Sequence, residues 1–509
     1  MKLFSASQIR EIDASTISEL GISSVALMER AAQACTDRLL SEFSTAHSFY
    51  VFCGLGNNGG DGLAIARQLF LAGKSVIVFS LDRSAGVSPD NLFMQEELKK
   101  HCSIEPIILE SIQQILELKS EKAVIIDALL GTGTSRPCEG WIAEIISAIN
   151  RLSSCVVSID VPSGMPADFY KNAFPAIKAT VTYTFEFPKV AFMLPSAMAY
   201  VNRLELLQIG LSKKAIDGIS TTYFLTTEQD IISFLKLRDR VAHKGQFGHA
   251  QIIAGSKGKS GAAIIAARAC LRSGAGLLTV RTTADTATAL NVALPEAMTE
   301  VVDGDTVDSL EKTDRFSVIG IGPGIGVNAI STQLIRQLLN YYQGRLVVDA
   351  DAITILAENP TWLNYLPPHS ILTPHVKEFS RLVGVMDDPF DRLLAARHFA
   401  EKYRVILILK GAHTAIAMPD GTVHFNSTGN AGLAKGGSGD ALTGILTGLL
   451  ARGYNAPQAA LLGVYLHGFA ADLLVKEYSI ESLLATDVAE KIPYALKSLE
   501  SLGFVEGVR

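Results

Sequence analysis

The sequence predicts an α/β protein of two domains, each built on a largely parallel β-sheet with helices on both faces. The chain has 509 residues, more than one hydrophobic core usually supports, so at least two domains are expected. Short apolar segments typical of strands alternate with segments of helical periodicity in both halves, as in α/β domains. Several strand segments run into an aspartate or a glycine-rich stretch, and parallel strands place such ends at one ligand-binding edge.

Composition and charge exclude several classes of protein. Apolar residues make up 48% of the chain, and the formal net charge of −6 is not gathered in blocks, so we expect large cores and no nucleic acid as partner. The six cysteines form no CxxC pair and the ten histidines lack metal-ligand spacing, which is typical of a cytosolic protein with reduced thiols. Residues 1–13 lack an apolar signal segment, and no apolar run reaches the roughly 18 residues of a membrane helix. We therefore expect a soluble cytoplasmic protein without a membrane partner.

The first domain is expected to open with two helices that cover a βαβ unit. In chain order the pattern predicts helices over residues 9–17 and 27–40, a strand over 49–53, a glycine-rich loop over 54–62, a helix over 63–71 and a strand over 75–79. A βαβ unit places its first loop at the carboxyl edge of the sheet, where ligands bind in open α/β folds. The loop is not a dinucleotide fingerprint, because no acidic residue in the right context follows its third glycine. Its amides and carboxylate, Asn57, Asn58 and Asp61, exceed what a tight turn requires and indicate a binding loop.

Two further strands of the first domain end in polar residues. Residues 123–126 run into Asp127, and residues 155–159 run into Asp160, with Ser163 in the loop that follows. Because these strands share an edge with the glycine-rich loop, we expect Asn58, Asp127, Asp160 and Ser163 to converge. Oxygen-rich clusters of this kind hold hard cations, while a carboxylate in a pocket serves as acid or base; the plainer alternative is that each aspartate caps its loop. Strands over 180–185 and 204–208 complete this sheet.

A polar, poorly periodic segment near residue 220 separates the halves, giving domains 1–220 and 221–509. The second domain repeats the alternation of strands and helices as a doubly wound sheet. Its strands are expected over residues 251–254, 316–320, 346–348, 371–372 and 405–409, and its helices over 262–273, 442–450, 457–475 and 486–499.

The stretch from residue 429 to residue 442 carries the strongest chemical signal of the second domain. Four glycines lie between residues 432 and 439, and Asp440 precedes an apolar helix. Unpaired amides at a helix N-terminus favour an anion such as phosphate, and glycines let the backbone approach it. A carboxylate beside phosphate suits a general base that takes a proton from an attacking hydroxyl. The alternative is a glycine-rich turn in which Asp440 is a plain helix cap.

Other strand ends of the second domain offer further candidates. Lys410 and Thr414 follow a strand and could reach nucleotide phosphates, although an exposed lysine at a turn is the commoner case. His375 and Glu378 lie three residues apart on one helical face, too few for a metal site, so substrate positioning is the better interpretation. The Gly-Pro-Gly segment 322–324 is either a turn or a ligand contact at the same edge.

These motifs together resemble a known family. Residues 53–62, the segment Asp127-Ala128-x-x-Gly131-Thr132-Gly133 and the segment Asp160-Val161-Pro162-Ser163-Gly164 resemble the NAD(P)HX epimerases. The second half resembles the ADP/ATP-dependent NAD(P)H-hydrate dehydratases in His243-Lys244-Gly245, Gly322-Pro323-Gly324, Thr373-Pro374-His375-x-x-Glu378, Lys410-Gly411-x-x-Thr414 and the run Asn430-x-Gly432-x-x-Lys435-Gly436-Gly437-Ser438-Gly439-Asp440. In this order, over essentially the whole chain, the two parts resemble the bifunctional NAD(P)H-hydrate repair enzymes. The resemblance implies a Rossmann-like three-layer sandwich followed by a ribokinase-like domain.

For the second domain the resemblance implies dehydration of hydrated NADH or NADPH coupled to ADP, with Mg²⁺ bridging the phosphates. Phosphoryl transfer to the hydrate's hydroxyl would make a good leaving group, with Asp440 as base. The implied substrate residues are Gly322, Gly324, His375, Glu378 and Asp440. The implied nucleotide residues are Lys410, Gly411, His413, Thr414, Asn430, Gly432, Lys435, Gly436, Gly437, Ser438 and Gly439.

For the first domain the resemblance implies interconversion of the R and S hydrates, with Asp160 in proton transfer and K⁺ held by Asn58, Asp127 and Ser163. The implied substrate residues are Asn57, Asn58, Gly59, Gly60, Asp61, Gly131, Thr132, Gly133, Arg136 and Asp160. The chain departs from the family pattern twice. Residues 165–167 lack an acidic residue that relatives often carry, and bulk in residues 184–189 replaces a usual glycine.

Two other functions fit parts of the sequence. A small-molecule kinase of the ribokinase class would use the same Gly-Ser-Gly-Asp segment but would leave a stable phosphorylated product. A binding module in residues 1–220 would hold a ligand without catalysis, although it has little use for the Asn58, Asp127 and Asp160 set. We expect hydrated NADH or NADPH and ADP as the small-molecule partners, and a homo-oligomer.

Overall fold

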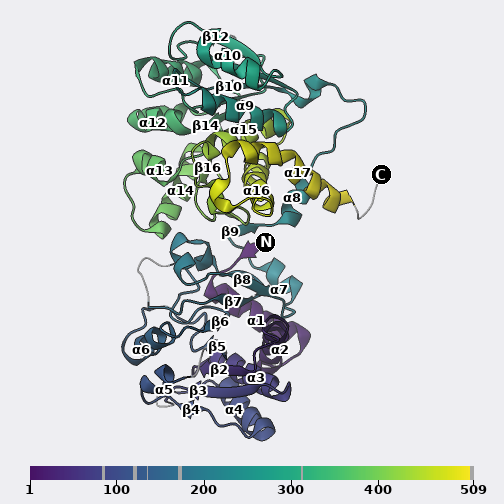
Figure 1. The fold of residues 1–509 in the computed structure, drawn as a ribbon, viewed down its shortest axis with the longest axis vertical. Coiled ribbons are helices and arrows are strands. Elements are labelled where there is room, and N and C mark those ends of the chain that lie inside the picture. Colours follow the sequence, from purple (N-terminus) through teal and green to yellow (C-terminus); the bar gives the residue numbers. More distant parts are fainter. Residues whose placement is uncertain (83–85, 119–122, 135, 170–174, 311–312, 505–509) are drawn as a thin grey trace. The chain divides into compact units, whose positions relative to one another are not determined.

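The computed structural model describes residues 1–504 apart from 83–85, 119–122, 135, 170–174 and 311–312 (Figure 1). Contacts divide the chain into two compact units. One comprises Lys2–Thr221 with Asp388–Phe390, and the other comprises Thr222–Asp387 and Asp391–Arg509 with Met1. Each unit has a central sheet with helices on both sides, so the predicted α/β class is confirmed.

The elements of the N-terminal unit follow one another as strand and helix. They are β1 (Lys2–Leu3), α1 (Ala6–Leu20), α2 (Ser24–Glu42), β2 (Ser48–Cys53), α3 (Asn57–Leu71), β3 (Ser75–Ser80), α4 (Pro89–Cys102), β4 (Ile107–Ile108), α5 (Gln113–Leu116), β5 (Ala123–Ala128), α6 (Gly140–Ile149), β6 (Cys155–Ile159), β7 (Val181–Phe185), β8 (Leu204–Leu207) and α7 (Lys213–Gly218).

The sheet of this unit is parallel throughout, in the order β4-β3-β2-β5-β6-β7-β8. Alternate side chains of β2 enter different cores. Phe49, Val51 and Cys53 join a cluster with α2, α3 and α4, whereas Tyr50 and Phe52 join one with α5 and α6. This alternation is what a strand buried on both faces produces, and it gives the three layers that the sequence predicted.

The strand order reverses between β2 and β5, since the chain runs outward to β3 and β4 and then returns to β5. In open parallel sheets such a reversal leaves a crevice beyond the carboxyl ends of the two strands. Cys53 of β2 is in register with Ala128 of β5, so the loops after both strands begin at the same level.

The C-terminal unit is longer and follows the same alternation. Its elements are β9 (Tyr223–Thr226), α8 (Glu228–Phe234), β10 (His249–Ile253), α9 (Ser260–Arg272), β11 (Leu277–Thr283), α10 (Ala284–Ala293), β12 (Met298–Val302), β13 (Val318–Ile321), α11 (Ala329–Tyr341), β14 (Arg345–Val348), α12 (Ala350–Glu358), β15 (Ile371–Leu372), α13 (Val376–Val383), α14 (Pro389–Tyr403), β16 (Ile406–Leu409), β17 (Ala415–Ala417), β18 (Val423–Asn426), α15 (Ser438–Ala451), α16 (Ala456–Leu474) and α17 (Ala485–Phe504).

Within this unit the strands run in the order β9-β18-β17-β16-β15-β14-β13-β10-β11-β12. The strands from β12 to β16 pair in parallel, with the reversal of strand order between β10 and β13. Strand β17 is antiparallel to both β16 and β18, and the sequence analysis did not predict this antiparallel pairing. Helices α9, α15, α16 and α17 share one core cluster, and Figure 1 shows α11, α12, α13 and α14 along the other side of the sheet.

Among the helices that begin earlier than the sequence predicted, two bear on the candidate sites. Helix α3 begins at Asn57 rather than at residue 63, and α15 begins at Ser438 rather than at residue 442. The glycines and asparagines there have low helix propensity, but close packing overrides it. A Cβ atom at Gly62, for instance, would lie 2.6 Å from the Cβ of Ala128. The predicted binding loops are therefore partly first turns of helices, whose free amides face the strand ends.

Among the described residues, no helix is long and apolar enough to cross a membrane.

The contact between α15 and α9 gives a test of the C-terminal core. A Cβ atom at Gly444 would lie 2.1 Å from the carbonyl oxygen of Ala266, so Gly444→Ala should lower the free energy of unfolding by about 1–3 kcal/mol. Gly261→Ala on α9 is the matched control, because its Cβ meets nothing within 4 Å; it should be neutral or stabilising by up to about 1 kcal/mol. Urea unfolding in a Trp141→Phe background makes Trp362 the reporter, since the chain has two tryptophans. Equal stability of the two variants would contradict the packing argument.

Candidate functional site

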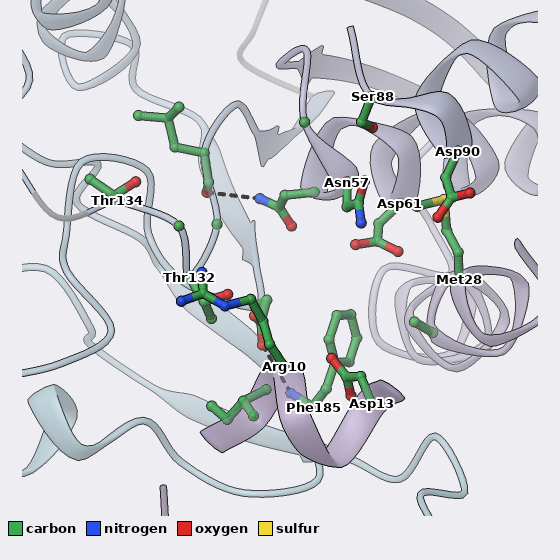
Figure 2. Close-up of a pocket in the computed structure, with 18 of the residues that line it drawn as sticks. Arg10, Asp13, Met28, Asn57, Asp61, Ser88, Asp90, Thr132, Thr134 and Phe185 are labelled. Carbon is green, nitrogen blue, oxygen red and sulfur yellow. Dashed lines mark hydrogen bonds between the residues drawn. The ribbon is translucent and has the colours of Figure 1, made fainter. Parts of the chain in front are cut away.

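A cavity of about 970 Å³ lies at the reversal point of the N-terminal sheet (Figure 2). Figure 2 shows Asn57 and Asp61 of α3 on one side, with Thr132 of the loop after β5 opposite and Asp13 of α1 below. The predicted residues that line it are Asn57, Asn58, Asp61, Gly131, Thr132, Gly133, Arg136 and Asp160. The crevice expected from strand order therefore holds most of the predicted first-domain residues.

Gly59 and Gly60 do not line this cavity but bring α3 close to its neighbours. A Cβ at Gly59 would lie 2.0 Å from the carbonyl oxygen of Gly54, and one at Gly60 would lie 2.8 Å from the Met28 side chain. Asn91 fixes the same turn by donating hydrogen bonds to the carbonyls of Gly54 (3.0 Å) and Gly56 (2.9 Å). These glycines let α3 approach its neighbours closely and so place its amides and side chains at the cavity.

Asn58, Asp127 and Ser163 gather around the Leu130 backbone beside the cavity. Asn58 Nδ2 donates to the carbonyl of Leu130 (2.8 Å), while Ser163 Oγ accepts from the Leu130 amide (2.8 Å) and donates to Asp127 Oδ1 (2.5 Å). The buried carboxylate of Asp127 also accepts from Ser158 Oγ (2.7 Å) and the Ser163 amide (2.9 Å). Burial raises the pKa of Asp127, and these hydrogen bonds oppose the rise.

The oxygen Asn58 Oδ1 is buried and has no hydrogen-bond partner among the residues that the structure describes. A buried acceptor without a donor is costly unless something else satisfies it, and a cation that prefers oxygen ligands would do so. The described residues contain no group of three or more His, Cys, Asp or Glu side chains that could hold a metal ion. A hard monovalent cation bound through amide, hydroxyl and carboxylate oxygens fits this donor set better than a transition metal.

Asp160 lies at the end of β6 in a buried ion pair that the sequence analysis did not predict. Its Oδ1 is 2.7 Å from Lys189 Nζ, and the Lys189 side chain is only 1% exposed. Asp160 has φ +65°, a left-handed conformation that is uncommon for residues with a side chain. A lysine so deeply buried is almost always paired, so Lys189 and Asp160 form one unit.

Two more carboxyl groups face Asp160 across the cavity. Burial, with the nearby charge of Asp160, raises the pKa of Asp13 to about 6, while Lys189 acts to lower it. Burial also raises the pKa of Asp61 well above its ordinary value, and Asp160, Asp13 and Asp90 add to the shift. Perturbed carboxyl groups in a cavity mark a site able to exchange protons.

In the C-terminal unit, Asp349 forms the centre of the candidate site. It follows β14, is 1% exposed, and accepts hydrogen bonds from Lys410 Nζ (3.0 Å) at Oδ1 and Thr443 Oγ1 (2.8 Å) at Oδ2. Burial acts to raise the pKa of Asp349, but the Lys410 ammonium and hydrogen bonds from Thr373, Lys410 and Thr443 hold it below its ordinary value. The sequence analysis assigned Asp349 no role, although it follows a strand just as Asp127 and Asp160 do.

The first turn of α15 packs directly on this ion pair. A Cβ at Gly439 would lie 3.3 Å from both Asp349 Oδ2 and Lys410 Nζ, and Gly437 supplies the cap with φ +90°. Asp440 stands in the same turn. Burial, then the charge of Asp349, raises the pKa of Asp440 to about 6, and Lys410 acts in the opposite direction. Free amides, a lysine and a carboxyl that titrates near neutrality therefore meet at one edge of the sheet.

Other predicted residues border this arrangement. His375 caps α13, with its Nδ1 accepting from the amides of Lys377 and Glu378, and its Nε2 is 3.3 Å from the Glu378 carboxylate. That carboxylate is also 4.0 Å from Lys410 Nζ. Gly322 has φ +130°, and a Cβ there would lie 1.9 Å from the carbonyl oxygen of Asp349. His375, Glu378 and Gly322 are thus brought to the same edge, whereas Gly324 packs against Lys259 and Ala262.

The remaining nucleotide candidates are held by contacts within their loops and with residues farther along the chain. Thr414 Oγ1 donates to the carbonyl of Gly411 (3.0 Å), and His413 Nδ1 is 3.4 Å from the carbonyl of Asn426. Asn430 Nδ2 donates to Asp472 Oδ1 (2.8 Å), and Lys435 Nζ donates to the carbonyl of Glu481. The sequence analysis did not single out Asp472. Gly432 packs against Leu483, while a Cβ at Gly436 would meet nothing within 4 Å.

The sequence analysis missed residues whose partners are distant in the chain. Asp13, Lys189 and Asp472 occupy helices or loops without a motif, so nothing local indicated them. For Asp349 the signal was present, since an aspartate ends an apolar strand.

Comparison with known proteins gives consistent matches for both units. A family model of the YjeF-related protein N-terminus matches residues 24–191, and one of NAD(P)H-hydrate dehydratase matches residues 250–494. A bifunctional NAD(P)H-hydrate repair enzyme from Moorella thermoacetica is 35% identical over 98% of this chain and 97% of its own length. The enzyme of that name from Coxiella burnetii is 35% identical over 96% of this chain and 97% of its own. A crystal structure of an ADP/ATP-dependent NAD(P)H-hydrate dehydratase from Bacillus subtilis, obtained with ATP and Mg²⁺, is 34% identical, covers 55% of this chain and all of its own, and has a TM-score of 0.49.

The raised pKa of Asp440 predicts that its ionisation opposes folding. Stability is then lost as the pH rises from the ordinary carboxyl value of 3.8 through about 6. Asp440→Asn should therefore be more stable than the parent at pH 7.5 by about 1–2 kcal/mol, after allowance for partial exposure. The gain should shrink as the pH falls toward 4, as measured by urea unfolding with the Trp362 reporter. Glu358→Gln, an exposed carboxylate at the end of α12, is the control; a gain for Asp440→Asn that does not depend on pH would contradict the argument.

Proposed function

Because this chain belongs to the family of bifunctional NAD(P)H-hydrate repair enzymes, we propose that it restores hydrated NADH and NADPH to the reduced dinucleotides. The family match confirms the resemblance of the motifs. In this proposal residues 1–220 interconvert the R and S hydrates, and residues 221–509 dehydrate the S hydrate at the expense of ADP. The observation that carries it is the first turn of α15, where Asp440 meets free amides beside Lys410 and Asp349.

The dehydratase reaction follows from the chemistry of that turn. Hydroxide is a poor leaving group, so the hydrate's oxygen takes a phosphoryl group from ADP while Asp440 accepts the hydroxyl proton. The amides of residues 436–439 and the ammonium group of Lys410 stabilise charge on the transferred group. The ring nitrogen then expels phosphate, and the adjacent ring carbon loses a proton to form the C=C bond, leaving AMP, phosphate and the reduced dinucleotide. A carboxyl with a pKa of about 6 is ionised at neutral pH and still basic enough for this step.

The substrates of this half are the hydrate and a complex of ADP with Mg²⁺. Support for the metal comes from the charge of the diphosphate, which Mg²⁺ neutralises through the phosphate oxygens while retaining water. The substrate residues in the proposal are Gly322, Gly324, His375, Glu378 and Asp440. The nucleotide residues are Lys410, Gly411, His413, Thr414, Asn430, Gly432, Lys435, Gly436, Gly437, Ser438 and Gly439.

In the epimerase half the cavity of Figure 2 is the proposed substrate site. Asp160 transfers the proton of the hydrate's hydroxyl as one epimer converts into the other. The substrate residues in the proposal are Asn57, Asn58, Gly59, Gly60, Asp61, Gly131, Thr132, Gly133, Arg136 and Asp160. The α3 glycines set the position of the Asn57 and Asp61 side chains.

K⁺ is the proposed cofactor of the epimerase half, held by Asn58, Asp127 and Ser163. The unsatisfied oxygen Asn58 Oδ1 supports it, and the neighbouring carboxylate supplies charge. The ion would neutralise the buried charge of Asp127 and hold the first turn of α3 in place. The proposal also takes the protein to be a homo-oligomeric cytoplasmic enzyme that acts without nucleic acid or membrane.

The test of the dehydratase function is Asp440→Asn in the full-length protein. With the S hydrate and Mg²⁺–ADP, and then with ATP, the absorbance of the dihydronicotinamide ring should recover in the parent. In the variant we expect recovery to fall by at least about a hundredfold, because the hydroxyl loses its base, while ADP still binds by calorimetry. Glu358→Gln should match the parent.

The same assay separates the dehydratase from a ribokinase-class kinase. A kinase would accumulate a phosphorylated substrate, whereas the dehydratase releases phosphate in step with the absorbance change. Unchanged turnover in Asp440→Asn would exclude Asp440 as the base.

The test of the epimerase function is Asp160→Asn. The parent should repair a mixture of R and S hydrates completely, whereas the variant should consume the S hydrate and then slow to the spontaneous rate of interconversion. Chiral separation of the remaining hydrate gives the epimer that is left. Asp37→Asn, an exposed carboxylate on α2, is the control. Full repair of both epimers by Asp160→Asn would remove Asp160 from the reaction.

A further inference from the structure

The two oxygens of Asp160 differ in their surroundings. Oδ1 is 2.7 Å from Lys189 Nζ and accepts longer hydrogen bonds from Thr184 Oγ1 and the Phe185 amide, both at 3.4 Å. Within the described part of the chain, Oδ2 accepts no hydrogen bond from the protein. Since Asp160 lines the cavity, Oδ2 is the oxygen that remains available to a substrate.

Lys189 reaches Asp160 because of a sharp turn after β7. Glu186 has φ +59°, and its Oε1 accepts from the amides of Ile209 (2.9 Å), Gly210 (2.8 Å) and Leu211 (3.1 Å). Three amides on one carboxylate oxygen hold the turn in a conformation that a residue with a side chain seldom adopts. This segment is where the sequence departs from the glycine usual in relatives, and the departure leaves the lysine in place.

The ion pair between Lys189 and Asp160 is buried, with the lysine 1% and the aspartate 13% exposed. Water therefore screens the attraction between the two charges little. The lysine therefore fixes the orientation of the Asp160 carboxylate, while it takes up only one of the two oxygens. That is the arrangement a proton acceptor needs: oriented and open on one side.

We propose that Lys189 is a positioning residue of the epimerase reaction, whose ammonium group holds Oδ1 of Asp160 and leaves Oδ2 to take and return the proton of the substrate hydroxyl. This inference rests on the epimerase function proposed above. In the step, the O–H bond of the hydrate breaks and its proton bonds to Oδ2, while the oxygen's electron pair forms a C=O bond and the ring C–N bond breaks toward nitrogen. When the nitrogen adds to the opposite face of this carbonyl, the C–N bond forms again and the carboxyl returns the proton to the oxygen, so no proton is gained or lost over a turnover.

The charges around the pair set the direction of the pH dependence. Asp13 faces it from α1, Asp61 from α3 and the Cys35 thiol from α2, and Arg10 lines the same cavity. Burial raises the pKa of Cys35, and Asp61 and Asp160 raise it further. Loss of the lysine would leave three neighbouring carboxyl groups without their buried cation. The acid side of the pH profile should then move upward.

The experiment compares Lys189→Met and Lys189→Arg with the parent in the full-length protein, using the R hydrate, Mg²⁺–ADP and K⁺ from pH 5 to pH 9. For Lys189→Met we expect kcat for use of the R hydrate to fall at least about tenfold at pH 7. KM should stay within about threefold, and the acid limb should move up by about one pH unit or more. Lys189→Arg, which keeps the charge, should recover part of kcat and return the limb toward the parent's.

Two controls report on folding and on the site. Direct dehydration of the S hydrate in the same variants depends on the other domain and should match the parent, and near-ultraviolet circular dichroism should show an intact first domain. Lys178→Met removes an exposed lysine of that domain and should have no effect.

Failure of the inference is distinguishable from failure of the proposed function. A parent that does not interconvert the epimers would overturn the epimerase function itself. A parent that does, with Lys189→Met unchanged in kcat and in its acid limb, would overturn the role of Lys189 alone. A rise in KM with kcat unchanged would also overturn it, because the lysine would then bind substrate instead of holding Asp160.

Discussion

A buried ion pair between a strand-end aspartate and a lysine organises the candidate site of each unit. Asp160 pairs with Lys189 at 2.7 Å in the first, and Asp349 pairs with Lys410 at 3.0 Å in the second. Burying a single charge is so costly that each partner depends on the other, and removal of one partner from a buried pair typically costs about 3–5 kcal/mol. These ion pairs therefore hold the loops that carry the lysines against the strand ends, and the other residues of each candidate site lie around the pairs.

The two pairs serve different proton chemistry. In the first unit the paired aspartate itself faces the cavity and is the proposed proton acceptor, which the lysine orients. In the second unit the paired aspartate is enclosed by Lys410 and Thr443, and the proposed acceptor is its neighbour Asp440, which forms no ion pair with the described residues. The pKa of Asp440 rises to about 6 because burial and Asp349 both oppose its charge and outweigh the effect of Lys410.

The sequence predicted the parts of these sites that follow from strand ends and glycine runs. Asp127, Asp160, Lys410 and the first turn of α15 all continue an apolar strand or precede an apolar helix, and local pattern is sufficient to find such residues. Lys189 and Asp13 could not be found in this way, because their importance arises from a contact across the sheet edge. The antiparallel β17 was missed for a similar reason: three residues, Ala415–Ala417, are too few to show a period. The early start of α3 was missed because packing on β5 outweighs the low helix propensity of its glycines.

Some backbone positions at these strand ends require glycine, whereas others carry a side chain in a strained conformation. Where one backbone must approach another, as Gly322 approaches the carbonyl of Asp349, only glycine fits, since a Cβ would lie 1.9 Å from that oxygen. Where a side chain is needed at a left-handed position, as at Asp160 and Glu186, the chain accepts a cost of about 1–3 kcal/mol per residue. That cost is offset locally, by the lysine at Asp160 and by three amides at Glu186. Glycines thus mark the backbone contacts of these sites, whereas Asp160, the proposed reactive carboxylate of the first unit, occupies a left-handed position that glycine would adopt more easily.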